Sequence, residues 1–292
     1  MSGIGRLGRL VLIGVPFLWF LLFFLLPLLI VFKISLARSA IGIPPYTALF
    51  GKGLSLAATG DNFARIAGDP LYLYAYLDSL LYAALATAFA LLFGYPIAYA
   101  IARAPGVWRQ LLLFFVMLPF WTSFLIRVYA WIAILKPNGF LNNLLIASGL
   151  VASPLPLLNN FFSVELGLVY SYLPFVILPI YGSLVRLDER LVEAAADLGA
   201  RPAVVFFRVT LPLTLPGVAA GALLVLIPAI GEFVIPALLG GPNTLMIGKV
   251  LWDEFFQNHD WPAAAAVAIV LVLGLAVPIL LAQRFLEAEA EG

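Results

Sequence analysis

Long apolar segments separated by short polar ones organise this chain of 292 residues. Six of these segments are close to the ~20 residues that a helix needs to cross ~30 Å of hydrocarbon. They cover residues 10–32, 77–101, 111–135, 162–184, 214–238 and 263–283. Because a backbone in lipid must satisfy its own hydrogen bonds, the pattern predicts an all-α integral membrane protein with six transmembrane helices.

The basic residues between the segments predict how the helices are oriented. Short cytosolic loops carry an excess of Lys and Arg. With the N-terminus in the cytosol, the cytosolic side holds Arg6, Arg9, Arg103, Arg109, Arg186, Arg190, Arg201, Arg208 and Arg284. The outer side then holds fewer basic residues, namely Lys33, Arg38, Lys52, Arg65, Lys136 and Lys249. An even number of spans places both termini in the cytosol, together with the polar segment 186–217.

That polar segment is the longest charged interruption between the apolar runs, and its residues predict a helix. Asp188 is a suitable N-cap, and Gly199 suits the left-handed position that ends a helix. Leu191, Ala195 and Leu198 fall on one face at the spacing of an amphipathic helix. We therefore expect a short helix with one apolar face, closed at both ends by its own residues.

A second short helix is predicted directly after the turn. Pro202 suits the first turn of a helix, which we expect over residues 203–209. Pro212 and Pro216 make it hard for this helix to continue unbroken. The segment is thus expected to be a helix, a tight turn and a second helix, protruding into the cytosol.

A fixed pattern runs through this hairpin: Glu193-Ala194-Ala195, three residues, Gly199, nine residues, and then Val209-Thr210-Leu211-Pro212. It resembles the EAA loop of ABC-transporter permease subunits, in which Ile usually stands at the position of Val209. In that family the loop is a coupling helix that sits in a cleft of the cytosolic ATPase. The resemblance implies that the coupling hairpin covers residues 186–212. It assigns the ATPase contact to Glu193, Ala194, Ala195, Gly199, Leu211 and Pro212.

Three further stretches narrow the resemblance. LPFWTSFLIRVYAWIAIL followed by PNG, then GEFVIPALLGG, and finally DWPAAAA are similar to the first permease subunit of spermidine/putrescine-type ABC importers, over roughly residues 71–283. This implies the type I ABC importer fold, as a single transmembrane permease domain over residues 1–292, in a bacterial inner membrane. It also implies three partners: an ABC ATPase dimer, a second homologous permease subunit and an extracytoplasmic substrate-binding protein.

The composition removes several other classes of protein. The chain is 64% hydrophobic and 11% charged, whereas soluble domains are about 25% charged. A net charge of +1 gives no argument for nucleic acid, and without cysteine there is no thiolate chemistry. A G-x-x-x-x-G-K-[ST] phosphate loop is missing, so we expect this chain to bind no nucleotide. The resemblance implies no cofactor and no enzyme activity, with ATP bound by the partner ATPase. His259 is the only histidine and is expected in a polar surface loop rather than at a metal site.

A carboxylate inside the fifth predicted span is a candidate for the solute path or its gate. Glu232 is flanked by Gly and Pro in an apolar run, where a charge is costly unless it is paired or hydrated. Arg127 is 18 residues from Arg109, and Glu232 is 18 residues from Thr214, so both lie about 27 Å from the cytosolic end. Equal depth permits an ion pair, and Glu165 is a rival partner. A salt bridge, a gate latch and an anionic site for a cationic substrate all remain open.

Three aromatic residues are close to Arg127 in the sequence. Trp121, Tyr129 and Trp131 could stack on a cation in the solute path. Tyr129 and Trp131 fit an outer aromatic belt equally well.

The sequence therefore predicts a permease subunit that forms half of a translocation path, with a polyamine as the substrate that the resemblance implies. Another small organic solute, or ferric iron, is the alternative within the same class. A stand-alone channel or a secondary transporter is the alternative from another class, and it would need no ATPase.

Overall fold

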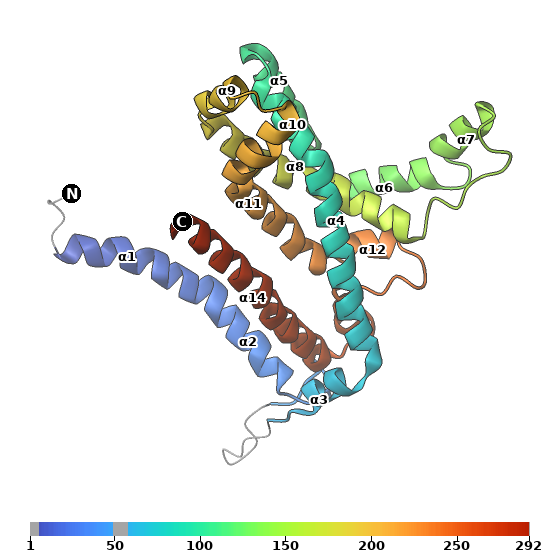
Figure 1. Ribbon diagram of the computed structural model, residues 1–292. Helices are drawn as coiled ribbons and strands as arrows, with labels where there is room; N and C mark the ends of the chain where they lie inside the picture. Colours follow the sequence, from blue (N-terminus) through green and yellow to red (C-terminus); the bar gives the residue numbers. More distant parts are fainter. Residues whose placement is uncertain (1–5, 49–57, 292) are drawn as a thin grey trace. The chain divides into compact units, whose positions relative to one another are not determined.

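A computed structural model describes residues 6–48 and 58–291, and its regular elements over that range are helices (Figure 1). This confirms the predicted all-α class. Within the described residues, five helices are long and apolar enough to cross a membrane: Leu12–Ser35, Pro70–Arg103, Phe124–Ala147, Phe161–Arg186 and Pro202–Ile230. The sixth predicted span lies in the last helix, whose described apolar part is Trp261–Ala276. The total of six spans and the cytosolic position of both termini stay predictions.

The chain forms two compact units. The first comprises Met1–Leu73 and Val250–Gly274, and the second comprises Tyr74–Lys249 and Leu275–Gly292. Elements of the first unit are α1 (Arg6–Phe20), the π-helix η1 (Leu21–Leu25), α2 (Leu26–Ser35), α3 (Asp61–Gly68), the π-helix η4 (Asp253–Gln257) and the first part of α14 (Trp261–Glu291). Three of the described helices, α4 (Pro70–Arg103), α13 (Ile247–Trp252) and α14, pass from one unit into the other.

The second unit holds the remaining helices. They are α5 (Gly106–Met117), the 3₁₀ turn η2 (Leu118–Trp121), α6 (Phe124–Leu135), α7 (Phe140–Ala147), α8 (Phe161–Arg186), α9 (Glu189–Asp197), α10 (Pro202–Val205), the π-helix η3 (Phe206–Thr210), α11 (Leu211–Ile230) and α12 (Val234–Leu239).

Polar contacts around Glu254 hold the first unit together. The buried Glu254 carboxylate accepts hydrogen bonds from Arg65 at 3.1 Å and from the Tyr72 hydroxyl at 2.7 Å. Arg65 also pairs with Asp260 at 3.0 Å. Burial disfavours the charge of Arg65, but Tyr72, Glu254 and Asp260 outweigh that effect and raise its pKa. These contacts tie α3 to η4 and to the start of α14.

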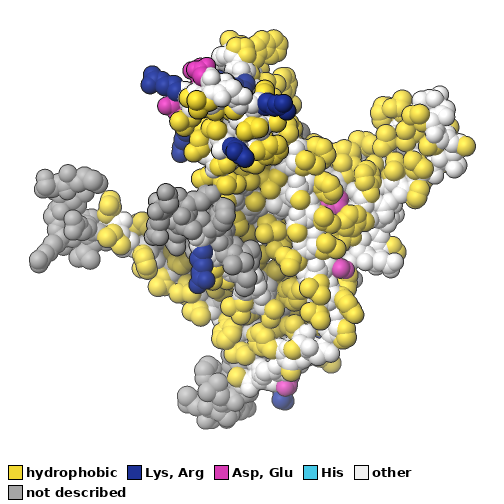
Figure 2. Space-filling model, viewed as in Figure 1, with side chains coloured by type: hydrophobic (Ala, Val, Ile, Leu, Met, Phe, Trp, Pro, Cys, Tyr) yellow, Lys and Arg dark blue, Asp and Glu magenta, His cyan; other side chains and the backbone are white. Residues whose placement is uncertain are grey.

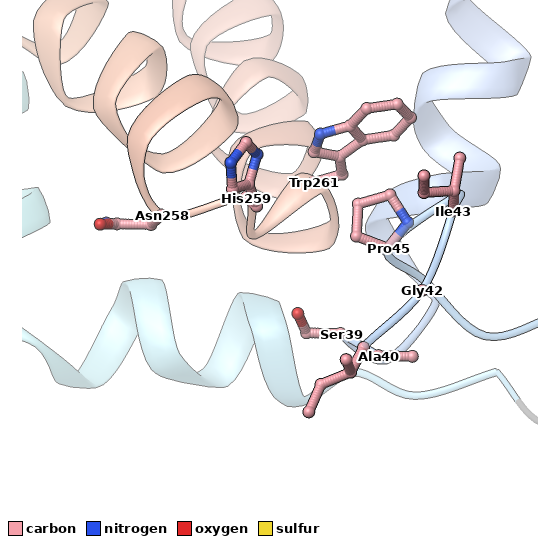
Figure 3. Close-up of a pocket in the computed structure, with 9 residues that line it drawn as sticks. Ser39, Ala40, Gly42, Ile43, Pro45, Asn258, His259 and Trp261 are labelled. Carbon is pink, nitrogen blue, oxygen red and sulfur yellow. The ribbon is translucent and has the colours of Figure 1, made fainter.

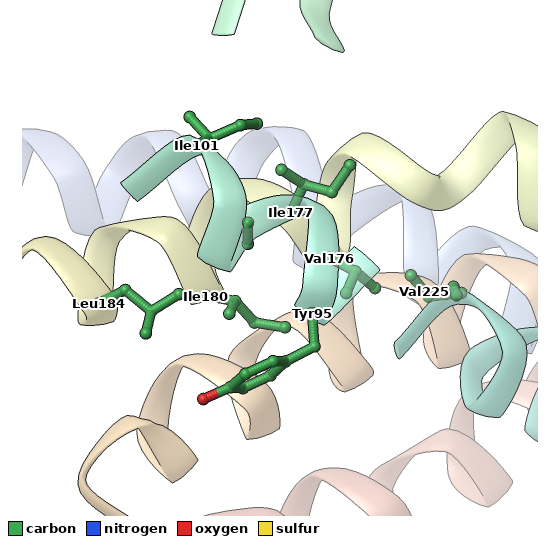
Figure 4. Close-up of a cluster of buried hydrophobic side chains, with 9 residues drawn as sticks. Tyr95, Ile101, Val176, Ile177, Ile180, Leu184 and Val225 are labelled. Carbon is green, nitrogen blue, oxygen red and sulfur yellow. The ribbon is translucent and has the colours of Figure 1, made fainter. Parts of the chain in front are cut away.

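Helices α4, α8 and α11 form the core of the second unit (Figure 4). Its buried side chains are Ala90, Tyr95, Ala98, Ile101, Val176, Ile177, Ile180, Leu184 and Val225. Small residues let the helices approach closely. A Cβ on Gly221 of α11 would lie 3.2 Å from the Val176 Cα of α8, and one on Gly217 would clash with the Ser183 side chain. This confirms the GxxxG packing face that the spacing of Gly217 and Gly221 predicts.

The third predicted span, residues 111–135, is wrong as a single helix. Between α5 and α6 the chain passes through η2 and the extended residues Thr122 and Ser123. Pro119 has no N–H to continue a helix, and the Thr122 hydroxyl bonds to the Pro119 carbonyl at 2.8 Å. Every residue near this break is compatible with a membrane interior, so hydrophobicity alone carries no signal for it.

The fifth predicted span, residues 214–238, is interrupted as well. Helix α11 ends before Gly231, and α12 begins three residues later. At its other end α11 continues without a break from α10 through η3, contrary to the prediction from Pro212 and Pro216. The π turn, in which the Leu211 N–H bonds to the Phe206 carbonyl, precedes Pro212. The π turn changes the hydrogen-bond register just before Pro212, so the helix accommodates the N–H that Pro212 lacks.

Candidate functional site

The hairpin formed by α9 and α10 is closed by its own backbone and side chains. The Asp188 carboxylate accepts a hydrogen bond of 3.0 Å from a backbone N–H in the first turn of α9. At the other end Gly199 has φ +80°, its N–H bonds to Ala196, and the next N–H, of Ala200, bonds to the Ala195 carbonyl. These two bonds form a Schellman motif. The predicted N-cap and the predicted left-handed glycine are both confirmed.

The predicted ATPase-contact residues in α9 and its turn are open to their surroundings. Glu193, Ala194 and Gly199 are exposed, and Ala195 is half-buried. On the apolar face, Leu198 is 90% exposed and is not covered by this chain. Figure 2 shows charged side chains gathered over the region of α9 and α10, while hydrophobic side chains cover the helices away from it. A charged and partly apolar projection of this kind is typical of a protein-contact surface.

The last two residues of the pattern, Leu211 and Pro212, lie outside the hairpin turn. They form the first turn of α11, where Leu211 is half-buried and Pro212 is exposed. They therefore mark the point at which the hairpin continues into a long helix of the second unit.

One ion pair ties the hairpin to the end of α4. The Arg103 guanidinium lies 3.2 Å from the Glu189 carboxylate and above the ring of Tyr99, at 5.4 Å. Beneath this pair is a cavity of about 180 Å³, which Arg109 also lines. Arg109 donates to the Ala102 carbonyl at 3.0 Å. The base of the hairpin thus contacts the ends of α4 and α8 and the start of α5.

Glu232, one of the predicted path residues, acts as a helix cap. It lies between α11 and α12, and its Oε1 accepts from the backbone N–H groups of Phe233 at 3.1 Å and Val234 at 2.9 Å. Its Oε2 accepts from the Tyr172 hydroxyl at 2.6 Å, which connects the break to α8. Three donors therefore satisfy this carboxylate.

Arg127 is not paired with Glu232 or with Glu165 in this structure; within the described part of the chain, its close neighbours are rings. The guanidinium lies 5.4 Å from the ring of Phe120 and 5.6 Å from that of Phe124. Its Nε and Nη1 are buried without a hydrogen-bond partner. The equal-depth argument for an ion pair assumed a continuous third helix, and the break at η2 removes its basis.

The three predicted aromatic residues lie in different surroundings. Trp121 is 76% exposed and meets Phe114 edge to face, and Tyr129 is exposed. Trp131 packs on Tyr170 of α8, with ring centroids 5.3 Å apart. The structure therefore does not gather them around Arg127, and their part in the solute path stays a prediction.

Two further carboxylates in apolar helices belong with these candidate site residues. Glu165 of α8 is 5% exposed, and both of its carboxylate oxygens are buried without a hydrogen-bond partner. Asp78 lies half-buried in α4, within the apolar stretch Pro70–Arg103. Sequence reasoning gave Glu165 only the role of a rival partner and gave Asp78 none. The available signal was a carboxylate inside an apolar helix, which is costly and so marks a functional position.

The first unit has an open cavity of about 630 Å³ (Figure 3). A loop that includes Ser39 and Pro45 forms one wall, and Asn258, His259 and Trp261 form another. His259 therefore lies in a surface loop, as predicted. The lining offers one titratable side chain among neutral ones, which is too few for a metal site.

The helical spans and the exposed hairpin together define a multi-pass membrane protein of the permease class. Residues 90–287 match the family described as "Binding-protein-dependent transport system inner membrane component". The chain belongs to this family and is a non-catalytic transport component of the inner membrane.

Two PotB relatives within the family are similar over nearly their whole length, and a third relative is similar over about two thirds or more. The chain is 41% identical over 273 residues to the spermidine/putrescine transport system permease protein PotB of Haemophilus influenzae, covering 93% of this chain and 92% of the relative. It is 39% identical to PotB of Escherichia coli, covering 94% and 97%. It is 32% identical to the inner membrane ABC transporter permease protein YdcU of Escherichia coli, covering 71% and 70%.

Solved structures confirm the type I ABC importer fold. A chain of the bacterial alginate ABC transporter, in complex with an alginate pentasaccharide-bound periplasmic protein, matches with a TM-score of 0.66 and 20% identity. The match covers 96% of this chain and 94% of that one. A chain of the inward-facing MetNI methionine ABC transporter matches with a TM-score of 0.57 and 16% identity, over 75% and 96%.

Proposed function

We propose that this chain is a permease subunit of an ATP-driven importer and forms half of a path for polyamines such as spermidine and putrescine. The observation that carries the proposal is the exposed, self-capped hairpin between two long apolar helices, with Glu193 and Leu198 open to a partner. The spermidine/putrescine permeases that share 39–41% of its residues over more than nine-tenths of both chains support the substrate class.

The hairpin is suited to transmit force from a cytosolic ATPase. Its second helix continues through η3 into α11, and α11 packs closely on α8 at Gly217 and Gly221. A displacement of the hairpin therefore moves two packed helices as one body. If the inward-open and outward-open arrangements differ by a few kcal/mol, ATPase closure and solute binding can each shift the balance between them.

The proposal includes three protein partners. An ABC ATPase dimer binds and hydrolyses ATP, so this chain itself binds no nucleotide. A second, homologous permease completes the path, and an extracytoplasmic binding protein delivers the solute. The family description supports the binding protein, and the alginate transporter, of similar fold, is known in complex with a periplasmic protein.

Reconstitution tests the function. The chain is assembled with its partner permease, its ATPase and its binding protein in liposomes, and the ATP-dependent uptake of labelled spermidine and putrescine is measured. We expect uptake that requires all four components. Uptake of another solute but no polyamine would overturn the substrate, and solute flux through this chain alone would overturn the importer.

A pair of matched substitutions tests the hairpin. Leu198→Asp places a charge on the exposed apolar face and should abolish co-purification with the ATPase. Leu150→Asp is the control, since Leu150 is 73% exposed and lies outside the hairpin. Equal ATPase retention by the two variants would remove the hairpin from the contact.

A further inference from the structure

Two glutamates of the second unit, both in apolar surroundings, differ in what their carboxylates contact. Glu232 accepts three hydrogen bonds, from Tyr172 and from two backbone N–H groups. Glu165 accepts none, although both of its oxygens are buried. Burying a carboxylate without a donor or a counter-charge is costly. The fold therefore supplies hydrogen-bond donors to the Glu232 carboxylate. Among the described residues, the Glu165 carboxylate has neither a donor nor a cation beside it.

A tyrosine and a second carboxylate belong to the same region as Glu165. The ring of Tyr82 lies 4.9 Å from that of Phe161, which is one helical turn before Glu165 on α8. Thr244 lies beside the Tyr82 hydroxyl, and Asp78 and Glu165 both act on it electrostatically. Asp78 lies one helical turn before Tyr82 on α4, and α8 supplies Glu165. Within the described part of the chain, no Lys or Arg lies within ion-pair distance of either carboxylate. Two carboxyl groups thus lie near one aromatic ring without a counter-charge among the described residues.

The segment 240–247 lies against this group of residues. The Ser163 hydroxyl of α8 donates to the Leu239 carbonyl at 2.7 Å, just before the segment. At its other end the Ile247 N–H donates to the Ser79 hydroxyl of α4, also at 2.7 Å. Both serines neighbour the carboxylates in sequence, and Thr244 contacts Tyr82 in between. A few hydrogen bonds to α4 and α8 therefore fasten the segment beside Asp78 and Glu165.

We propose that Asp78, Tyr82 and Glu165 form a site for one ammonium group of a polyamine, covered by segment 240–247. This inference rests on the proposed function and names the residues that contact the substrate. An alkylammonium group supplies three N–H donors and a positive charge. The described part of the fold offers the Glu165 carboxylate neither a donor nor a counter-charge. The ring of Tyr82 adds a surface that attracts a cation. Glu232, which the sequence singles out, is then a structural cap.

Substitution in the reconstituted importer tests the site. With wild-type protein, polyamine uptake is established first, and its absence there would defeat the proposed function rather than the site. Glu165→Gln and Asp78→Asn should each raise the KM for spermidine on the order of tenfold or more, because a charged partner of the ammonium is lost. Glu165→Asp should recover part of the affinity. ATPase activity without solute and assembly with the ATPase should be unchanged.

Two comparisons make the result specific. Asp61→Asn removes an exposed carboxylate of the first unit and should leave the KM as in the wild type. Glu232→Gln should change the KM less than Glu165→Gln does. If Glu232→Gln raises the KM while Glu165→Gln transports like the wild type, the assignment is overturned.

A chemical measurement on the wild-type complex covers the case in which a variant fails to assemble. Dicyclohexylcarbodiimide modifies carboxyl groups in apolar surroundings, and mass spectrometry locates the product. Spermidine should slow the modification of Glu165 and leave the modification of Glu232 unchanged. Equal modification of Glu165 with and without spermidine would overturn the site.

Discussion

The hairpin of α9 and α10 and the break between α11 and α12 both turn the chain, but their polar groups find partners in different ways. In the hairpin, Asp188 and Gly199 close both ends of α9 with bonds that span only a few residues. At the break, the Oε1 atom of Glu232 caps the start of α12 by accepting from two adjacent backbone N–H groups. Its Oε2 atom accepts from the hydroxyl of Tyr172, which is sixty residues away. One turn is complete by itself and exposed; the other is half-buried and needs α8.

The two turns therefore differ in which contacts hold their shape. The hairpin keeps its own shape because the bonds that cap α9 do not involve the core, and Arg103 alone adds an ion pair to it among the described residues. The break cannot shift without losing a bond to α8. The proposed ATPase side thus has a shape set by local bonds, whereas the region around Glu232 depends on a contact with α8.

The largest effect is expected at the glycine that ends α9. Gly199→Val puts a β-branched residue at φ +80°, where a left-handed backbone costs about 1–2 kcal/mol. The hairpin should lose its shape and its affinity for the ATPase, measured by co-purification. Gly149→Val is the matched control, since Gly149 has φ +72°, has open space for a Cβ as Gly199 does, and lies after α7. The interpretation fails if both variants retain the ATPase equally.

A smaller effect is expected at the break. Tyr172→Phe removes the 2.6 Å hydrogen bond to Glu232, and such bonds between helices in membranes contribute about 0.6 kcal/mol on average and up to about 1.7. The denaturation midpoint of the purified protein should fall accordingly. Tyr129→Phe is the control, because Tyr129 is 57% exposed. A midpoint equal to that of the wild type would show that α8 does not stabilise the break.

The smallest effect is expected at the ion pair between Arg103 and Glu189. Their side chains are 39% and 71% exposed, and exposed pairs contribute roughly 0.2–1 kcal/mol. Arg103→Glu and Glu189→Arg should each weaken ATPase association slightly, and combining them should restore it. The effect should shrink at high salt, since salt screens exposed charges. If the combined exchange were worse than either single change, the pair would not hold the hairpin.

Local signals in the sequence were enough to predict the hairpin. Asp188, Gly199 and Pro202 occupy the positions that their backbone preferences indicate, because a cap depends on residues only a few places away. The GxxxG spacing likewise predicted the close packing of α11, and apolar length predicted the helical class.

Features that depend on distant contacts could not be predicted in this way. The breaks at Thr122 and Gly231 lie inside apolar runs, where hydrophobicity is the same for a straight and a broken helix. The surroundings of Arg127 and Glu165 depend on which helix lies opposite each of them, and one sequence does not state that. Asp78 was visible as a charge in an apolar stretch, but Glu165 is 87 residues away from it along the chain.

The Schellman motif at Gly199 has a consequence for how such proteins diverge. The bonds that cap α9 all lie within residues 188–200, so this segment can be exchanged between chains with one ion pair, from Glu189 to Arg103, linking it to the helices beneath. The surface offered to a motor subunit and the interior that selects a solute can then change independently. New pairings of the two can arise by recombination, with little effect on folding.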